Sequence, residues 1–430
     1  MRAARVLVVG ETIAGAEETA AVLRARGFDT AASSSETAIA ELLASRRPDV
    51  VLFENPAGEK PANDNYEAFA SAIRDTKLWA DLPFIILGDE ACELLPGDAA
   101  LLVDRLGDDA LPAELDFRIK SVARLAVMRS ELSRRSRTLE RMGLPVPRSV
   151  SPPAFVPEPN ILIIGAGRGA LKVQNAHGDG PKYFGAPTVN LALDALEKNQ
   201  IDAVAIDATN DTEQAVEALS ALRRIATWTT IPAIAITSDN SSGLELHEAG
   251  ASDVLPLSCE DERIVTRMHL LVREQRYASA IQAVFRDTRN LPRDPDCPLA
   301  SREFALAHLI DLVDGCDRHG DALSIVAVSV AGAGASKVAS AFGGALAKMV
   351  RGEDLAARVG EGFFIIMLPS TDLMMAERVR DRISRVVSAT DFGRDDDGKL
   401  VISDVSYSVQ SYKPGDTSDS LLARTLDRLG

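Results

Sequence analysis

The sequence has little cysteine and no long hydrophobic run. Its four cysteines, Cys92, Cys259, Cys297 and Cys316, are scattered, without the paired spacing of a disulfide framework or a zinc motif. No apolar stretch approaches the roughly 18–20 residues that a membrane-spanning helix needs, and the first residues lead directly into a predicted strand. These absences favour a soluble, cytoplasmic protein with reduced cysteines, no metal site and no membrane span.

The sequence also lacks an excess of basic residues. Its 47 lysines and arginines stand against 63 aspartates and glutamates, which gives a net charge of −16. A nucleic-acid-binding face needs clustered positive charge, so this composition argues against a nucleic-acid partner. A small anion can still bind at a local arginine cluster, because salt screens the bulk charge over about 10 Å.

The chain does have enough apolar residues for several domains. With 430 residues, 46% hydrophobic and 26% charged, it is long enough for about three globular domains. In residues 1–142, strand patterns alternate with helical patterns, which predicts a doubly wound parallel sheet. The expected strands are Arg5–Gly10, Asp29–Ala32, Pro48–Phe53, Leu82–Leu87 and Ala100–Val103, and the expected helices are Ala14–Arg26, Glu36–Arg46 and Ala110–Arg141.

A proline-rich segment separates this first module from a second one. Residues 143–159 contain six prolines, which lack the amide hydrogens that helices and central strands need, so we expect an extended linker. Just before it, the last predicted helix carries Arg134, Arg135, Arg137 and Arg141 near its end, where we expect them to suit the helix dipole.

The strand and helix pattern then repeats in residues 160–290. The expected strands are Asn160–Ile164, Ala203–Ile206, Pro232–Ile236 and Gly250–Leu255, followed by a long helix over Asp261–Arg286. Residues 291–430 form a third predicted domain. The sequence thus predicts an α/β protein with two tandem doubly wound domains and a different third domain.

Both parallel-sheet modules resemble the receiver domains of two-component response regulators, which have a flavodoxin-like fold. Receivers hold magnesium with acids after the first strand, take phosphate on an aspartate that ends the third strand, and sense it with a lysine. The first module has Glu11, Glu54 and Arg105 at these positions, and Gly88 in place of the usual hydroxyl. Glu54 extends too far for this chemistry, so we expect no phosphorylation of this module.

The second module keeps an aspartate, Asp207, at the nucleophile position, with Thr237 after its fourth strand. Gly165 and Ala166 replace the magnesium-binding acids, and Pro256-Leu257 replaces the usual Thr-Lys. We therefore expect Asp207 to be an ordinary polar residue at a strand end. Phosphorylation at Asp207 is the alternative.

The same module contains a run, Gly165–Ala170, that fits the G-x-G-x-x-A form of a dinucleotide fingerprint. No acidic residue ends the next strand, and His177–Gly185 has the pattern of an inserted loop. We favour tight turns as the reason for these glycines, with dinucleotide binding as the alternative.

The third module carries the most informative motif, RGEDLAARVGEGFF, over Arg351–Phe364. This run resembles the GGDEF domain of diguanylate cyclases, whose usual motif is R-x-x-D, three residues, then R-[YF]-G-G-D-E-F. Arg351 and Asp354 keep the first half, whereas Gly360–Phe364 replaces the catalytic half. The resemblance covers most of Leu291–Gly430 and implies a GGDEF-like α/β domain with a mixed sheet.

The resemblance also implies that the cyclase site is lost. Ser329 stands where the family has a metal-binding aspartate, and Gly362 and Phe363 stand at the second ligand and its acidic neighbour. These side chains are poor partners for magnesium carrying a triphosphate. Glu361 comes one residue early, and on a strand that shift turns its side chain to the other face. We expect no enzyme activity; a residual cyclase that uses Glu361 is the alternative.

The retained residues match the family's inhibitory site, where the product, cyclic di-GMP, binds away from catalysis. A guanidinium such as that of Arg351 bonds guanine or phosphate in a bidentate manner, and the carboxylate of Asp354 can accept guanine N–H groups. The family completes this site with arginines on the following helix, where Arg378 and Arg382 stand four residues apart on one helical face. The resemblance implies that cyclic di-GMP is held by these four residues.

The order of two receivers and a GGDEF domain resembles the PleD class of response regulators and, within it, a non-catalytic member. The resemblance implies a cyclic di-GMP effector of two-component signalling that goes to a cell pole and acts in regulated proteolysis during the cell cycle. It implies protein partners, namely a proteolysis adaptor or substrate and polar recruitment factors, and a homodimer formed through the receivers. A scaffold driven by phosphorylation of Asp207 is the remaining alternative.

Overall fold

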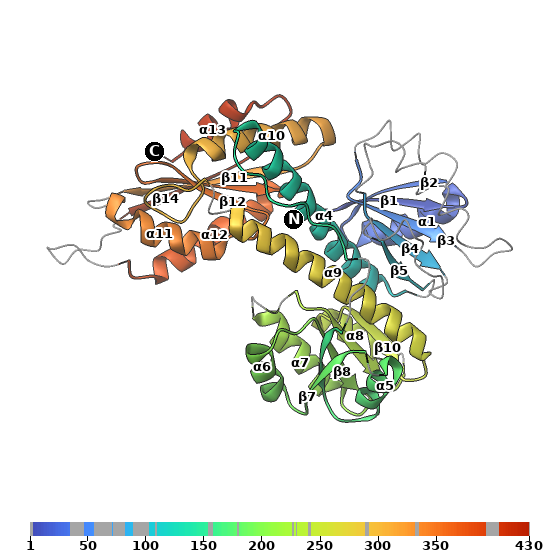
Figure 1. Cartoon of the computed structure of the whole chain (residues 1–430). Helices are drawn as coiled ribbons and strands as arrows, with labels where there is room; N and C mark the ends of the chain where they lie inside the picture. The colour runs from blue at the N-terminus through green and yellow to red at the C-terminus, as the bar shows by residue number, and fades with distance from the viewer. Residues whose placement is uncertain are drawn as a thin grey trace. The chain divides into compact units, whose positions relative to one another are not determined.

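The computed structural model divides the chain into two compact units (Figure 1). Unit 1 contains Val127–Ser149 and Ala280–Gly430, and unit 2 contains Ala4–Ala126 and Val150–Ser279. The residues that the structure describes are 3–34, 47–55, 71, 82–88, 103–107, 110–153, 158–178, 180–225, 228, 230–239, 242–288, 292–331, 335–392 and 404–429.

The first sheet of unit 2 is parallel in every pair of neighbouring strands. Its strand order is β2-β1-β3-β4-β5, the flavodoxin-like order. The strands are β1 (Arg5–Gly10), β2 (Asp29–Ser34), β3 (Val50–Asn55), β4 (Phe84–Gly88) and β5 (Val103–Leu106), and the helices are α1 (Ile13–Ala25) and α4 (Pro112–Arg141). Thr12 caps α1 by accepting from the Gly15 amide. The expected helix over Glu36–Arg46 lies outside the described residues.

The second sheet of unit 2 repeats this arrangement. Its order is β10-β9-β8-β6-β7, which is again 2-1-3-4-5 when its strands are counted along the chain. The strands are β6 (Asn160–Ile164), β7 (Lys182–Ala186), β8 (Ala203–Ala208), β9 (Ala233–Thr237) and β10 (Asp253–Pro256), and the helices are α5 (Arg168–His177), α6 (Val189–Lys198), α7 (Thr212–Arg224), α8 (Gly243–Ala249) and α9 (Asp261–Thr288). The predicted parallel sheets are confirmed.

One expectation for this sheet was wrong. The segment His177–Gly185 is not an inserted loop, because it contains most of β7, which pairs in parallel with β6. The strand β7 lies at the edge of the sheet, and only Ala186 of it is buried. Such an edge strand, with a mixture of exposed and partly buried residues, lacks the long apolar run that marks the central strands.

Unit 1 is built on an antiparallel sheet of order β12-β13-β11-β14. Its strands are β11 (Leu323–Ala331), β12 (Leu355–Gly360), β13 (Phe363–Pro369) and β14 (Asp404–Ser411), and its helices are α10 (Arg302–His319), α11 (Ala335–Met349), α12 (Leu373–Ala389) and α13 (Ser418–Leu426). Its named strands pair only antiparallel; the parallel component expected of a mixed sheet is confined to an isolated bridge, Ala300–Ala357.

Two hydrophobic cores lie on the two faces of this sheet. Figure 1 shows α10 and α13 on one side of the sheet and α11 and α12 on the other. Alternate residues of β11 point to opposite faces, so Ile325 packs with α10 and α13 while Val326 packs with α11 and α12. Leu139 of α4 belongs to the first of these cores. The end of α4 is therefore an integral part of unit 1.

The long helices α4 and α9 are each shared between the two units, since each unit takes in part of both. The described residues of 143–159 form neither helix nor strand, and the linker stays a prediction. The expected domain boundaries at 1–142, 160–290 and 291–430 stay predictions. Within the described part of the chain, every helix is too short or too polar to cross a membrane.

Candidate functional site

The motif residues Arg351 and Asp354 form a tight turn between α11 and β12. The Arg351 amide donates a hydrogen bond of 2.9 Å to Oδ2 of Asp354. Asp354 is 4% exposed, whereas the side chain of Arg351 lies at the surface. The turn thus places a guanidinium at the surface close to a buried carboxyl group.

The carboxyl group of Asp354 has an unusual environment. Burial, and then the charge of neighbouring Glu353, raise its pKa from 3.8 to about 6, although the Arg351 amide opposes the shift. Among the described residues, this carboxylate accepts one hydrogen bond, from Arg351. A carboxylate has about four acceptor positions, so Asp354 retains capacity for further N–H donors.

The predicted arginines of α12 differ in their surroundings. Asp372 caps this helix by accepting from the Met375 amide, which fixes its start. Nη2 of Arg382 donates 2.9 Å to the carbonyl of Met349, two residues before Arg351, so Arg382 lies beside the turn. Arg378 is exposed one helical turn earlier. Their role in binding a ligand stays a prediction.

Two further side chains, Arg135 and Phe285, contact the same turn, and neither was predicted from the sequence. Nη2 of Arg135, on α4, donates to the backbone carbonyls of Glu353 (3.2 Å) and Asp354 (3.0 Å). Phe285, on α9, packs so closely on Gly352 that a Cβ there would lie 2.9 Å from its ring.

Arg135 was expected to serve the helix dipole, but it is fully buried. The signal that could have found it is the apolar spacing of Leu125, Met128, Leu132 and Leu139, because it continues along α4 beyond the first sheet.

The residues that replace the family's catalytic acids in the sequence lie together at one edge of the sheet. Ser329 of β11 lies opposite Phe363 of β13, and the Val330 amide donates to the Gly362 carbonyl at 2.8 Å. Gly362 has φ +71, which glycine adopts without strain. Glu361 lies exposed in the turn between β12 and β13 rather than on a strand.

The described residues contain no cluster of three or more His, Cys, Asp or Glu side chains that could hold a metal ion. Three of the cysteines, Cys259, Cys297 and Cys316, are free thiols, and Cys92 lies outside the described residues.

Asp207 is surrounded by donors from its own chain. Its Oδ2 accepts from the Ala170 amide (3.1 Å), and its Oδ1 accepts from the amide (3.1 Å) and hydroxyl (2.6 Å) of Thr209. Burial raises the pKa of Asp207, but these hydrogen bonds and one from Gly167 together lower it by more than burial raises it. The pKa therefore lies below its ordinary value.

The glycines of the apparent dinucleotide fingerprint enclose this carboxylate. A Cβ on Gly167 or Gly169 would lie 2.7 Å from an Asp207 oxygen, and Gly165 has φ +104. The Asp207 carboxylate therefore occupies the start of α5, where a dinucleotide's phosphates would have to bind. This geometry supports the turn interpretation of the glycines over the dinucleotide alternative.

The matching position of the first sheet holds Glu54, at the end of β3. A Cβ on Gly10 would lie 2.8 Å from Oε2 of Glu54, so this carboxylate lies over the end of β1. Arg105 is buried, Glu11 is exposed, and Gly88 has φ +152.

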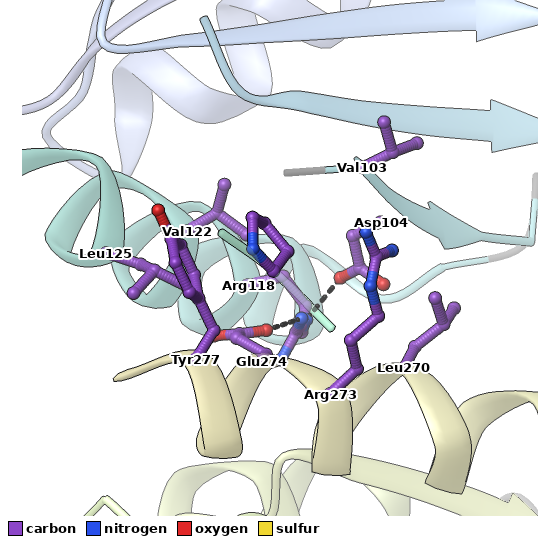
Figure 2. A pocket seen from close by; sticks show the side chains of 10 residues that line it. Val103, Asp104, Arg118, Val122, Leu125, Leu270, Arg273, Glu274 and Tyr277 are labelled. Carbon is purple, nitrogen blue, oxygen red and sulfur yellow. Dashed lines mark hydrogen bonds and ion pairs between the residues drawn. The ribbon is translucent and has the colours of Figure 1, made fainter. Parts of the chain in front are cut away.

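A small cavity lies elsewhere in unit 2, beside an ion-pair network (Figure 2). Figure 2 shows Arg118 bonded to both Asp104 and Glu274. Arg267 bonds to Asp104 (3.0 Å) and to Asp253 (2.5 Å). The cavity measures about 30 Å³, which is room for about one water molecule. It cannot admit a dinucleotide.

Comparisons with known proteins agree with the third module's motif. The family "Diguanylate cyclase, GGDEF domain" matches residues 335–428. The response regulator PleD of Caulobacter vibrioides is 22% identical over 452 residues, which cover 98% of this chain and 95% of PleD. The chain therefore has a GGDEF-type region and full-length homology to a PleD-like response regulator.

Solved structures of GGDEF domains are also similar. The GGDEF domain of DgcB from Caulobacter crescentus, in complex with c-di-GMP, is 18% identical with a TM-score of 0.30, covering 33% of this chain and 86% of that one. The diguanylate cyclase SiaD from Pseudomonas aeruginosa, in complex with its activator SiaC, is 23% identical with a TM-score of 0.30, covering 39% of this chain and 70% of that one.

Proposed function

We propose that this protein is a non-catalytic effector that binds cyclic di-GMP at the Arg351–Asp354 turn. The observation that carries the proposal is a contrast within one hairpin. At its beginning, Asp354 keeps unused acceptor capacity beside Arg351. At the other end of the same hairpin, Phe363 of β13 stands opposite Ser329 of the neighbouring strand β11, at positions where the family has acidic residues.

The turn offers complementary groups for a cyclic guanine dinucleotide. The guanidinium of Arg351 can bond the O6 and N7 atoms of guanine in a bidentate manner. Asp354 can accept from guanine N1 and N2, and Arg378 and Arg382 can bond the phosphates. Arg382 uses one donor on Met349, and an arginine has five.

The wider role rests on the homology to PleD. The degenerate sites resemble those of PopA, a non-catalytic paralogue of PleD, and this resemblance extends the proposal to protein partners in cell-cycle proteolysis, a homodimer and a cell-pole location. In this view the bound dinucleotide controls protein–protein contacts and no reaction takes place.

Calorimetric titration of the full chain with cyclic di-GMP tests the ligand. We expect a Kd in the micromolar range or tighter, and a loss of at least about 100-fold in Arg351→Ala, the cost of a bidentate charged contact. Arg380→Ala is the matched control, because Arg380 pairs with Asp381 on the same helix. Equal affinities in Arg351→Ala and the wild type would refute the site, and GTP turnover with magnesium would refute the non-catalytic role.

A further inference from the structure

The Arg351–Asp354 turn is attached to α4 through a fully buried polar network. Arg135, which donates to the carbonyls of Glu353 and Asp354, also donates from Nε to Oε1 of Glu131 at 2.7 Å. The same Glu131 oxygen lies 2.9 Å from Nε2 of His308 on α10. None of these side chains is more than 1% exposed.

The network continues along one face of α4. The hydroxyl of Thr138 lies 3.1 Å from Nδ1 of His308 and donates to Asp311 at 2.5 Å. Glu131, Arg135 and Thr138 are spaced by three or four residues, so they share one side of the helix. Burial raises the pKa of Glu131, but the charges of His308 and Arg135 lower it to about 2, so the carboxylate stays ionised.

A second helix holds the turn from the ring side. The guanidinium of Arg135 lies 4.6 Å from the centre of the Phe285 ring, and Phe285 packs on Gly352. The turn is therefore fixed by one side chain from α4 and one from α9. Both helices run on into unit 2, because α4 begins at Pro112 and α9 at Asp261.

We infer that Arg135 is a positioning residue that couples the Arg351–Asp354 turn to α4, so that ligand binding at the turn and the packing of α4 influence each other. This inference deepens the proposed function and rests on it for the identity of the ligand. Arg135 holds the carbonyls of the two residues that end the turn, and it bears no group toward the surface. A movement of Asp354 toward a ligand would therefore change the hydrogen bonds of Arg135. Because Arg135 bonds Glu131, and Glu131 bonds His308, such a change would also alter the packing of α4 on α10.

Hydrogen–deuterium exchange on the full chain, combined with calorimetry, tests the coupling. In the wild type, cyclic di-GMP is expected to slow exchange in residues 351–356 and also in residues 127–141. In Arg135→Gln, we expect affinity to fall about tenfold and the ligand-induced slowing in residues 127–141 to disappear. Substitution of a residue that only stabilises the fold would not remove the ligand-induced slowing in residues 127–141.

The matched control is Arg134→Gln on the same helix. Arg134 is also buried, and its short ion pair is with Asp321 at 2.6 Å. It reaches Glu131 only at 3.8 Å, whereas Arg135 bonds this carboxylate at 2.7 Å and also bonds the turn. We expect this variant to keep wild-type affinity and the transmitted slowing, even if it melts at a lower temperature. Loss of transmission in both variants, or in neither, overturns the inference.

The two proposals fail in different ways. Without ligand, Arg135→Gln should still speed exchange in residues 351–356 while Arg134→Gln does not, and equal rates in the two variants overturn the role of Arg135. A wild type that binds no cyclic di-GMP overturns the proposed function, whatever the ligand-free exchange shows. If the wild type binds cyclic di-GMP but exchange slows only in residues 351–356, the coupling is overturned and the proposed function is not.

Discussion

Asp207 in unit 2 and Asp354 in unit 1 are the same residue type in opposite situations. Asp207 is the last but one residue of β8, Asp354 directly precedes β12, and both accept a backbone N–H. Asp207 is partly exposed, yet its pKa lies below the ordinary value. Asp354 is buried, and its pKa rises to about 6.

The difference lies in how many donors surround each carboxylate. Asp207 receives amide and hydroxyl hydrogens from residues on both sides, which stabilise its charge more than burial opposes it. Asp354 receives one such hydrogen bond from the described residues, and the charge of Glu353 acts against it. Asp207 therefore receives several donors from its own chain, whereas Asp354 keeps acceptor positions that the described residues leave unfilled.

Of the two Asp→Asn substitutions, the one at Asp207 is expected to reduce the stability of the fold. Asp207→Asn removes an oxygen acceptor from a cluster of N–H and O–H donors, so we expect the free energy of unfolding at pH 7 to fall by about 2 kcal/mol. Urea denaturation of the full chain, followed by circular dichroism, measures this loss. Asp211→Asn is the control, because asparagine caps α7 as well as aspartate does. Equal losses of stability in the two variants would show that the donors around Asp207 do not contribute more to stability than an ordinary helix cap.

The Asp354→Asn substitution is expected to increase the free energy of unfolding, whereas Asp207→Asn decreases it. The folded pKa of about 6 lies above the ordinary 3.8, so the folded state holds the proton more tightly and stability declines as pH rises through this window. Asp354→Asn keeps an acceptor for the Arg351 amide and removes the charge. We expect a gain on the order of 2 kcal/mol at pH 7 that vanishes below about pH 4. Urea denaturation at both pH values measures it, and a loss at pH 7 would contradict the open carboxylate.

Ligand affinity should follow the ionisation of the same group. Guanine N–H groups need the ionised carboxylate, so we expect cyclic di-GMP to bind about tenfold more weakly at pH 5 than at pH 7. Calorimetric titration at several pH values gives the profile. In Asp354→Asn the affinity should be low and independent of pH, and a variant that keeps the wild-type slope would assign the titration to another group.

Glu361 provides the smallest expected effect. This carboxylate is exposed in the β12–β13 turn, so Glu361→Ala should change the free energy of unfolding by less than about 0.5 kcal/mol. It should also leave cyclic di-GMP affinity unchanged. GTP turnover by the wild type that the substitution removes would instead support the residual-cyclase alternative.

The strands with continuous apolar runs were predictable because burial on both faces leaves a plain pattern. Arg5–Gly10 and Asn160–Ile164 were predicted with the bounds that the structure gives. β7 was missed because this edge strand is buried only at Ala186 and carries no such pattern. The Arg351–Asp354 turn was found from a local motif, since its two residues are three positions apart in the chain.

The support of that turn was not predictable by the same means. Arg135 and Glu353 are far apart in the sequence, and nothing in a local motif reveals a bond from a side chain to a distant carbonyl. Arginines near a helix end fit the dipole equally well whether they are exposed or buried. The state of Asp354 was also hidden, because its pKa depends on burial and on which donors the fold supplies.

The third module is incomplete without the end of α4. Leu139 belongs to its core, and Glu131 lies against the buried His308. A piece of chain that began at residue 291 would expose both the apolar face of α10 and this imidazole to water. Residues 291–430 therefore depend on residues 127–141 for part of their core, and a fragment cut at the proline-rich linker would lack that part.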